Sequence, residues 1–392
     1  MRAAFSENSV KGAQKIVEMK GDFLHLIAPY MKTSDLDYEL PADRIARYPS
    51  AERDECRLLV YDRKTGMTTH SVFKNLPDFV GGRFDFFRND ASVLKGRIFA
   101  KKSTGGQVEC LLLRPADSGN PAEWNCMLKP GRRLGPGAKF GVDGEFEAEV
   151  IEKADGGIAA VRFSTFSCDG VEALSERLGV VPLPPYIARD QRSPGYDKSF
   201  DNERYQTVYA DSEKRVAAAA PTAGLHFTKE LQAKLSDAGS RFFDLTLHVG
   251  MGTFQPVKCD AVENHKMHSE IYEIPADTLR AMFDRRRPNL AVGTTSLRAM
   301  EDFYRKSGGR PPNCATSAFG SADIFVYPPQ TLLSADALIT NFHLPRSTLM
   351  CLVGAFVSPG DRDGIKILKE IYTDAVAKGY CFYSYGDAML IL

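Results

Sequence analysis

Three short segments place hydroxyl, amide and imidazole groups at points where an apolar stretch is followed by a helical pattern. They contain Pro221-Thr222, Thr294-Thr295 and Thr340-Asn341, and His343 follows the last of them. In open α/β sheets ligands bind beyond the carboxyl ends of the strands, where turn backbone and helix N-termini meet. One such turn would be unremarkable, because Ser, Thr and Asn cap helices in many proteins. Three of them in one chain indicate a ligand site.

A second set of polar groups lies on one face of an expected strand. From Phe242 to Val249 apolar and polar residues alternate, which places Asp244, Thr246 and His248 on the same side. His248 is therefore either a hydrogen-bonded core imidazole or a functional group with polar neighbours.

Several common site motifs are missing. His265 and His268 are spaced as a metal-binding pair, but no third ligand has a suitable spacing, so we expect no metal. Gly250–Phe254 lacks the GxGxxG fingerprint and indicates a tight turn, and the chain has no P-loop or GxSxG motif. The 50 Lys+Arg cancel the 50 Asp+Glu. A nucleic-acid partner would therefore need a local patch, such as Arg132-Arg133 or Arg285-Arg286-Arg287, both otherwise ordinary solvated surface.

Short β-strands separated by turn clusters dominate the chain from about Ala91 to Pro185. Several short strands at this spacing predict a small antiparallel β-barrel. A proline-rich stretch from Val180 to Arg189 then indicates an exit linker, because proline cannot continue a strand ladder. The expected strands are Val108–Leu113, Glu123–Leu128, Glu145–Glu152 and Ile158–Phe163.

From Arg204 onward strands alternate with helices, which predicts an α/β domain with a largely parallel sheet. A helix is expected from Thr228, with Leu231 and Leu235 on one face and Gly239 at its end.

The expected location of the protein is the cytoplasm. Its 8 cysteines are far apart and contain no CxxC pair, which is typical of reduced thiols. No apolar run approaches the ~18–20 residues of a membrane span, and the N-terminus lacks the order of a signal peptide. Residues 1–33 are expected to form an N-terminal extension, with Met31 as an alternative start, and the regular chain begins at Ser34.

Eight longer stretches, in order from Ser34 to the C-terminus, carry a resemblance to a known family. They resemble the S-adenosylmethionine:tRNA ribosyltransferase-isomerase family of queuosine biosynthesis. The stretches are SDLDYELPADRIARYP, ERYQTVYA, APTAGLHFT, LHVGMGTFQPV, HKMHSE, AVGTTSLR, DALITNFHLPRSTL and YSYGDAMLIL.

The resemblance implies an unusual use of S-adenosylmethionine. Its ribosyl part is transferred and isomerised onto 7-aminomethyl-7-deazaguanine at the tRNA wobble position, giving epoxyqueuosine with release of adenine and methionine. S-adenosylmethionine is consumed as a co-substrate, and no cofactor is implied. The implied fold is an α/β domain, residues 34–90 and 186–392, with the small antiparallel β-barrel of residues 91–185 inserted. We expect the protein to be a monomer that binds tRNA. We do not expect it to bind a membrane.

Roles follow from residue type once the reaction is implied. The reaction needs a base that removes the acidic ribose C5′–H proton and an acid that protonates the departing adenine. Histidine suits both roles. Arg298 would meet the methionine carboxylate or a tRNA phosphate. The catalytic candidates are His226, His248 and His343, with Asp244 as an orienting residue. The substrate-binding candidates are Thr222, Thr295, Asn341, Arg298 and Tyr205.

One segment departs from the family pattern. Family members carry Asn-Asp-Thr followed by a basic residue, whereas this chain has Ala91-Ser92 after Asn89-Asp90, with Lys95 as the nearest replacement cation. The alternative is therefore a diverged RNA-binding paralogue that is non-catalytic or has a redirected activity. A conventional methyltransferase is disfavoured, because the glycine-rich cofactor turn is missing.

Overall fold

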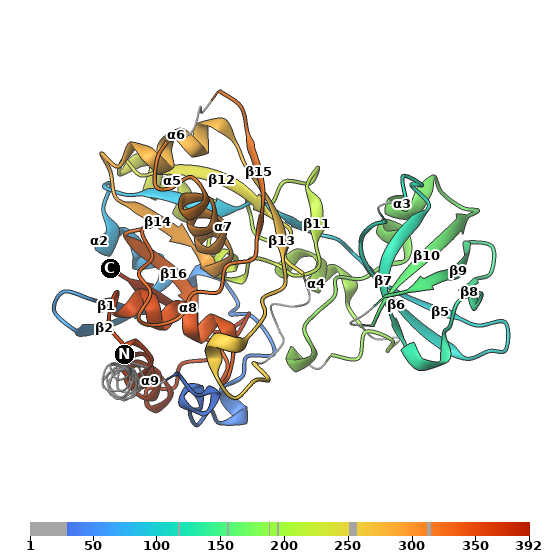
Figure 1. Cartoon of the computed structure of the whole chain (residues 1–392), viewed down its shortest axis with the longest axis horizontal. Coiled ribbons are helices and arrows are strands. Elements are labelled where there is room, and N and C mark those ends of the chain that lie inside the picture. The colour runs from blue at the N-terminus through green and yellow to red at the C-terminus, as the bar shows by residue number, and fades with distance from the viewer. Residues whose placement is uncertain are drawn as a thin grey trace, which may run out of the picture.

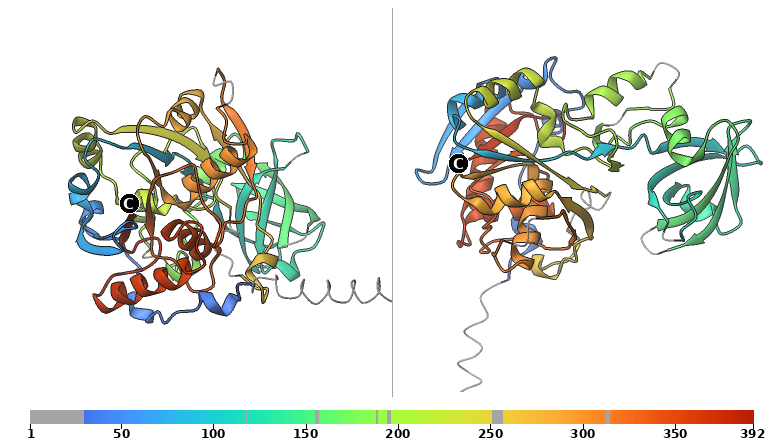
Figure 2. Two further views of the ribbon diagram at one scale, coloured as in Figure 1. Left: turned by 60° about the vertical axis from the view of Figure 1, so that its left-hand side comes forward. Right: turned by 90° about the horizontal axis from the view of Figure 1, so that it is seen from above.

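The computed structural model describes residues 30–116, 118–154, 157–187, 189–193, 196–250, 257–311 and 315–392. It contains a large α/β part built on a nine-stranded sheet and a smaller closed β-barrel, which lies to one side of it (Figures 1 and 2). The predicted fold class, an α/β domain with an inserted small antiparallel barrel, is confirmed.

The nine-stranded sheet is mixed, not largely parallel as the sequence suggested. β12–β3, β3–β14, β14–β16 and β17–β1 pair in parallel, whereas β16–β17, β1–β2, β12–β13 and β13–β15 pair antiparallel. The carboxyl ends of β12, β3, β14 and β16 consequently lie at one edge, beside the start of β17. In sheet order the strands are β15 (Ala318–Ala322), β13 (Glu270–Ile274), β12 (Arg241–Leu247), β3 (Asp85–Asn89), β14 (Asn289–Val292), β16 (Ala337–Asn341), β17 (Ala388–Ile391), β1 (Arg57–Asp62) and β2 (Met67–Val72).

Helices cover both faces of this sheet, and for that reason its central strands β3, β14 and β16 are buried throughout. One face packs against α6, α7, α8 and α9, and the other against α2 and α5. The expected helix after Thr228 is present as α5, and its N-cap threonine accepts from the Leu231 N–H. The helices are α2 (Leu76–Val80), α5 (Lys229–Asp237), α6 (Ala276–Asp284), α7 (Gly293–Lys306), α8 (Thr348–Val357) and α9 (Gly364–Ala377).

The barrel closes around its own apolar core, which includes the chain's tryptophan, Trp124. All its strand pairs are antiparallel, and its strands lie between Arg97 and Thr165, inside the expected segment 91–185. Two of them, β5 and β8, were not predicted. In order around the barrel the strands are β10 (Ile158–Thr165), β7 (Glu123–Lys129), β6 (Gln107–Pro115), β5 (Arg97–Lys101), β8 (Lys139–Val142) and β9 (Phe146–Lys153).

Short elements join the two parts. Helix α3 (Gly170–Leu178) follows the barrel, and β4 (Ser92–Val93) pairs with β11 (Arg215–Ala217) in a separate two-stranded sheet. The expected exit linker contains the short turn η7, and α4 follows it. The remaining elements are α4 (Lys198–Arg204) and the 3-10 turns η1 (Thr33–Leu36), η2 (Ala42–Arg44), η3 (Arg53–Glu55), η4 (Phe73–Asn75), η5 (Gly131–Arg133), η7 (Pro185–Ile187), η8 (Thr222–His226) and η10 (Val262–Asn264).

In the part of the chain that the structure describes, no helix is both long and apolar enough to cross a bilayer.

Candidate active site

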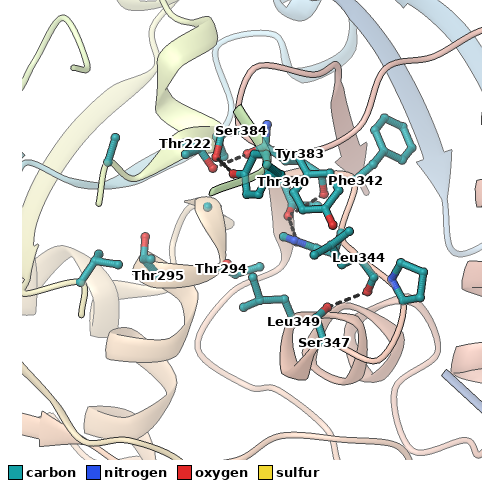
Figure 3. Close-up of a pocket in the computed structure, with 18 residues that line it drawn as sticks. Thr222, Thr294, Thr295, Thr340, Phe342, Leu344, Ser347, Leu349, Tyr383 and Ser384 are labelled. Atoms are coloured by element: carbon teal, nitrogen blue, oxygen red, sulfur yellow. Dashed lines mark hydrogen bonds between the residues drawn. The ribbon is translucent and has the colours of Figure 1, made fainter. Parts of the chain in front are cut away.

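A pocket lies at the carboxyl ends of β14 and β16, where the sequence predicted a ligand site (Figure 3). It holds about 910 Å³ of empty space, some of it open to solvent. All three predicted turns contribute. The turn η8 begins with Thr222, Thr294 and Thr295 lie in the first turn of α7, and Thr340, Asn341 and His343 lie at or just after the end of β16. The polar residues that line it are Thr222, Thr294, Thr295, Thr340, Asn341, His343, Ser347 and Ser384.

A chain of hydrogen bonds runs from the pocket wall into the core. The Thr222 hydroxyl donates to Asn341 Oδ1 at 2.8 Å, and Asn341 Nδ2 lies 3.1 Å from His226 Nε2. His226 Nδ1 in turn lies 3.1 Å from Cys56 Sγ. Burial, and to a lesser degree the Arg53 guanidinium, lowers the pKa of His226 to about 4, so the imidazole is neutral at neutral pH. His226 therefore acts on the pocket through Asn341.

His343 lies at the pocket wall itself. Its Nε2 is 2.9 Å from the hydroxyl of Thr340, three residues earlier at the end of β16. Burial lowers the pKa of His343 to about 3, so this imidazole is also neutral at neutral pH. A neutral imidazole in contact with the pocket can accept a proton from a bound molecule.

Two tyrosines hold the peptide groups of His343 from opposite sides. The His343 N–H donates to the Tyr372 hydroxyl at 3.1 Å, and the Tyr38 hydroxyl donates to the His343 carbonyl. Asp37, next to Tyr38, forms a two-pronged ion pair with Arg346. The SDLDYELP segment therefore fixes the loop after β16, although more than 300 residues separate Tyr38 from His343.

Helix α7 begins against the pocket. Gly293 has φ +89°, a conformation that favours glycine, and it turns the chain from β14 into the helix. The hydroxyl of Thr295 is buried and has no hydrogen-bond partner among the described residues. An unpaired hydroxyl and the N-terminal N–H groups of a 14-residue helix thus face the pocket, where they can bind a polar group of a ligand.

Two aromatic rings form another wall. Tyr186 and Tyr383 have ring centroids 4.2 Å apart at 42°, and the Tyr186 hydroxyl hydrogen-bonds to Ser384. Tyr383 has φ +74°, which is strained for a non-glycine residue. Tyr186 comes from the linker that leaves the barrel, so the position of the linker affects the shape of the pocket.

His248 and Asp244 are not brought to this pocket. Val249 lines the pocket, whereas His248 is not among the lining residues; the His248 backbone N–H donates to Ile271 O at 2.9 Å. Burial lowers the pKa of His248. The Asp244 carboxylate accepts from Arg88 Nε at 2.8 Å and Nη2 at 2.9 Å. The Asp244 carboxylate therefore links β12 to β3 through Arg88, and its role as an orienting residue stays a prediction.

Arg298 and Tyr205 are both buried away from the pocket lining. Arg298 forms an ion pair with Glu270 and donates to the carbonyls of His268 at 2.8 Å and Ala322 at 2.7 Å. It ties α7 to β13 and β15. Tyr205 is fully buried and packs edge-on against Tyr385. The substrate-binding roles of Arg298 and Tyr205 stay predictions.

The residues around the departure from the family pattern make structural contacts. Asn89 Oδ1 accepts from the N–H groups of Ala91 and Leu247, and the Asp90 carboxylate is bound by Thr246 and Lys214. Lys95 pairs with Glu176 of α3, so it joins the barrel to its helix.

Sequence reasoning missed Tyr38, Tyr186, Tyr383 and Ser384 as site residues. Three of them stand inside quoted stretches, SDLDYELP and YSYGDAMLIL, which was the available signal. The predicted turn at Gly250–Phe254 lies outside the described residues from Met251 on. In the described ranges no three His, Cys, Asp or Glu side chains gather as a metal site. His265 packs edge-on against Phe325.

Comparisons with known proteins identify the family that this chain resembles. A family model described as a queuosine biosynthesis protein matches residues 33–391. The S-adenosylmethionine:tRNA ribosyltransferase-isomerase of Thermotoga maritima is 40% identical over 365 residues, which is 92% of this chain and 100% of that protein. The protein of the same name from Acetivibrio thermocellus is 42% identical over 367 residues, again 92% and 100%. A crystal structure of S-adenosylmethionine tRNA ribosyltransferase from Thermotoga maritima, 30% identical, matches 92% of this chain and 100% of its own with a TM-score of 0.49.

Proposed function

The chain belongs to the S-adenosylmethionine:tRNA ribosyltransferase-isomerase family of queuosine biosynthesis, and we propose that the pocket at the ends of β14 and β16 is where it carries out this reaction. The chain is a transferase, and S-adenosylmethionine and tRNA are its substrates. Nothing found supports the alternative of a non-catalytic or redirected RNA-binding paralogue.

The two kinds of wall suit the two ends of a nucleoside. The tilted rings of Tyr186 and Tyr383 offer an aromatic surface for the adenine ring. Thr222, Thr295 and Asn341 offer hydroxyl and amide groups for the ribose. The single observation that carries the proposal is that these groups, from five distant segments, line one pocket.

His343 is the acid–base group in this proposal. A sulfonium acidifies the neighbouring ribose C5′–H, and neutral His343 takes that proton. The protonated His343 then passes the proton to adenine as the glycosidic bond breaks. His226 holds Asn341 in place from behind.

The finer features follow from the resemblance. The acceptor is the aminomethyl group of 7-aminomethyl-7-deazaguanine at the wobble position of tRNA, and the product is epoxyqueuosine. The chain works in the cytoplasm as a monomer, with no metal and no cofactor beyond its co-substrate.

The test is product analysis with S-adenosylmethionine and tRNA that bears the precursor base. We expect adenine and methionine in equal amounts, released only when that tRNA is present. S-adenosylhomocysteine would instead indicate a methyltransferase, and no product at all would favour the RNA-binding paralogue.

A further inference from the structure

An exposed tyrosine, Tyr48, has an arginine guanidinium over its ring. Tyr48, at the end of the SDLDYELPADRIARYP stretch, is 64% exposed. The guanidinium carbon of Arg189 lies 4.0 Å from its ring centroid. One face of the ring is therefore covered by a flat cation, and the high exposure leaves the remainder open to a partner.

The arginine on this ring is held firmly. Arg189 forms an ion pair with the fully buried Asp201 and donates to the carbonyl of Arg47 at 2.9 Å. Its guanidinium also lies 5.4 Å from the ring of Phe200 and 5.8 Å from that of Tyr385. These contacts hold the Arg189 guanidinium against one face of the Tyr48 ring. Little side-chain freedom is therefore lost when a planar group stacks on the other face.

Two further arginines lie nearby without a carboxylate partner. Among the described residues, Arg53 donates to the carbonyls of Leu225 at 3.1 Å and Glu203 at 2.7 Å. Arg204 donates to the carbonyls of Ala51 at 2.8 Å and Ser50 at 2.6 Å. Carbonyls are neutral, so the two positive charges are not cancelled at contact distance. Burial and then the Arg204 charge lower the pKa of Arg53, as expected for neighbouring cations.

The arginines lie next to the active-site pocket. Arg53 and Arg204 line a small surface hollow together with Ser384, and Ser384 also lines the pocket of Figure 3. Arg189, which contacts the Tyr48 ring, follows pocket-lining Tyr186 by three residues. Residues 383–386 thus contribute to both the pocket and the hollow that the two arginines line.

We propose that Tyr48 is a stacking platform for an unstacked base of the tRNA anticodon loop, and that Arg53 and Arg204 bind a phosphate of the same loop. The inference rests on the proposed function, because it takes tRNA as the partner. Loop bases are the part of an RNA that can be turned out and stacked on aromatic side chains and arginines. A chain with zero formal net charge also needs such a local site to hold RNA.

The first test measures binding without turnover. The dissociation constant of a fluorescent anticodon stem-loop is measured by anisotropy in the absence of S-adenosylmethionine. Tyr48→Ala and Tyr48→Leu should weaken binding about 5- to 150-fold, the range for one stacked base, whereas Tyr48→Phe should retain it. Phe319→Ala is the matched control, because Phe319 is 73% exposed on the far edge strand β15. Equal binding by wild type and Tyr48→Ala, with both folded by thermal melting, would overturn the proposal.

The second test separates stacking from a structural effect. Loop nucleotides are replaced one at a time by abasic residues, and binding by wild type and Tyr48→Ala is compared. At one position the difference between the two proteins should disappear, because no base is left to stack. A difference that persists at every position would show that the ring acts only on the fold.

The phosphate contacts have their own measurement. Arg204→Gln should reduce the slope of log affinity against log salt by about one, and Arg204→Lys should not. Unchanged slopes for both would remove the phosphate from the proposal. Because these assays need no catalysis, they stand even if the wild-type chain releases no adenine, an outcome that would overturn the proposed function alone.

Discussion

The hydroxyl of Tyr38 donates a hydrogen bond to the backbone carbonyl of His343, 305 residues away in the sequence. The N–H of the same histidine donates to Tyr372. Both peptide groups that flank the His343 side chain are thereby satisfied by tyrosines. The pocket loop after β16 is held in one conformation by a segment that precedes the whole sheet.

Tyr38→Phe should lower kcat for adenine release by roughly 2- to 10-fold, with a smaller change in KM for S-adenosylmethionine. The ring stays, but one neutral hydrogen bond of about 0.5–1.5 kcal/mol that positions the loop is lost. Steady-state kinetics with precursor tRNA measures both constants.

Tyr380→Phe is the matched control. Tyr380 packs edge-on against Phe342, as Tyr38 does against Tyr372. Its hydroxyl contacts His70 and the Leu58 carbonyl, not the pocket loop. Equal losses of kcat in the two variants would mean that general packing, not the hold on His343, is responsible.

His343→Ala should slow adenine release by about 10²- to 10⁴-fold, as expected for the loss of an acid–base group. His248→Ala should have a much smaller effect, because His248 is not among the residues that line the pocket. Rapid-quench measurement of adenine compares the two. The assignment fails if His248→Ala proves the more damaging substitution.

The pKa of His226 predicts how stability depends on pH. The folded pKa of about 4 lies below the ordinary value of 6.5, so the unfolded chain binds the proton more readily. This group lowers the free energy of unfolding as pH falls from about 6.5 to 4, by roughly 3 kcal/mol in total. Above pH 6.5 it has no effect.

Urea unfolding at pH 7 and pH 4 tests this, with His226→Gln as the comparison. Glutamine does not titrate, so the variant should lose less stability than the wild type over the same interval. Identical losses in the two proteins would show that His226 is not buried in its neutral form.

The local patterns in the sequence were sufficient to predict which turns form the pocket. Thr222, Thr295 and Asn341 each follow an apolar segment, and the end of such a segment depends only on nearby residues. Strand direction was harder to predict, because the period of two is the same in parallel and antiparallel strands. The antiparallel pairing of Asn341 with Ala388 could therefore not be predicted from the local sequence.

Partners of charged groups could not be predicted for a related reason. Asp244 and Arg88 are 156 residues apart and meet because β12 and β3 are neighbours in the sheet. The ion pair of Arg298 with Glu270 likewise needs α7 to pack on β13. Residue type alone suggested an orienting carboxylate and a substrate-binding arginine, whereas the ion pairs of both residues depend on long-range packing. The barrel strands β5 and β8 were missed because they are short, with 5 and 4 residues.

The strained residue in the aromatic wall allows its contribution to binding to be separated from its contribution to stability. Tyr383 has φ +74°, where an L-residue loses roughly 1–2 kcal/mol relative to glycine. Tyr383→Gly should therefore be more stable than Tyr383→Ala by about 1 kcal/mol in urea unfolding. Both variants lose the ring that packs at an angle against Tyr186, so both should raise KM for S-adenosylmethionine to a similar extent. If KM instead followed stability, with the glycine variant binding nearly as well as the wild type, the ring would serve the fold and not the adenine.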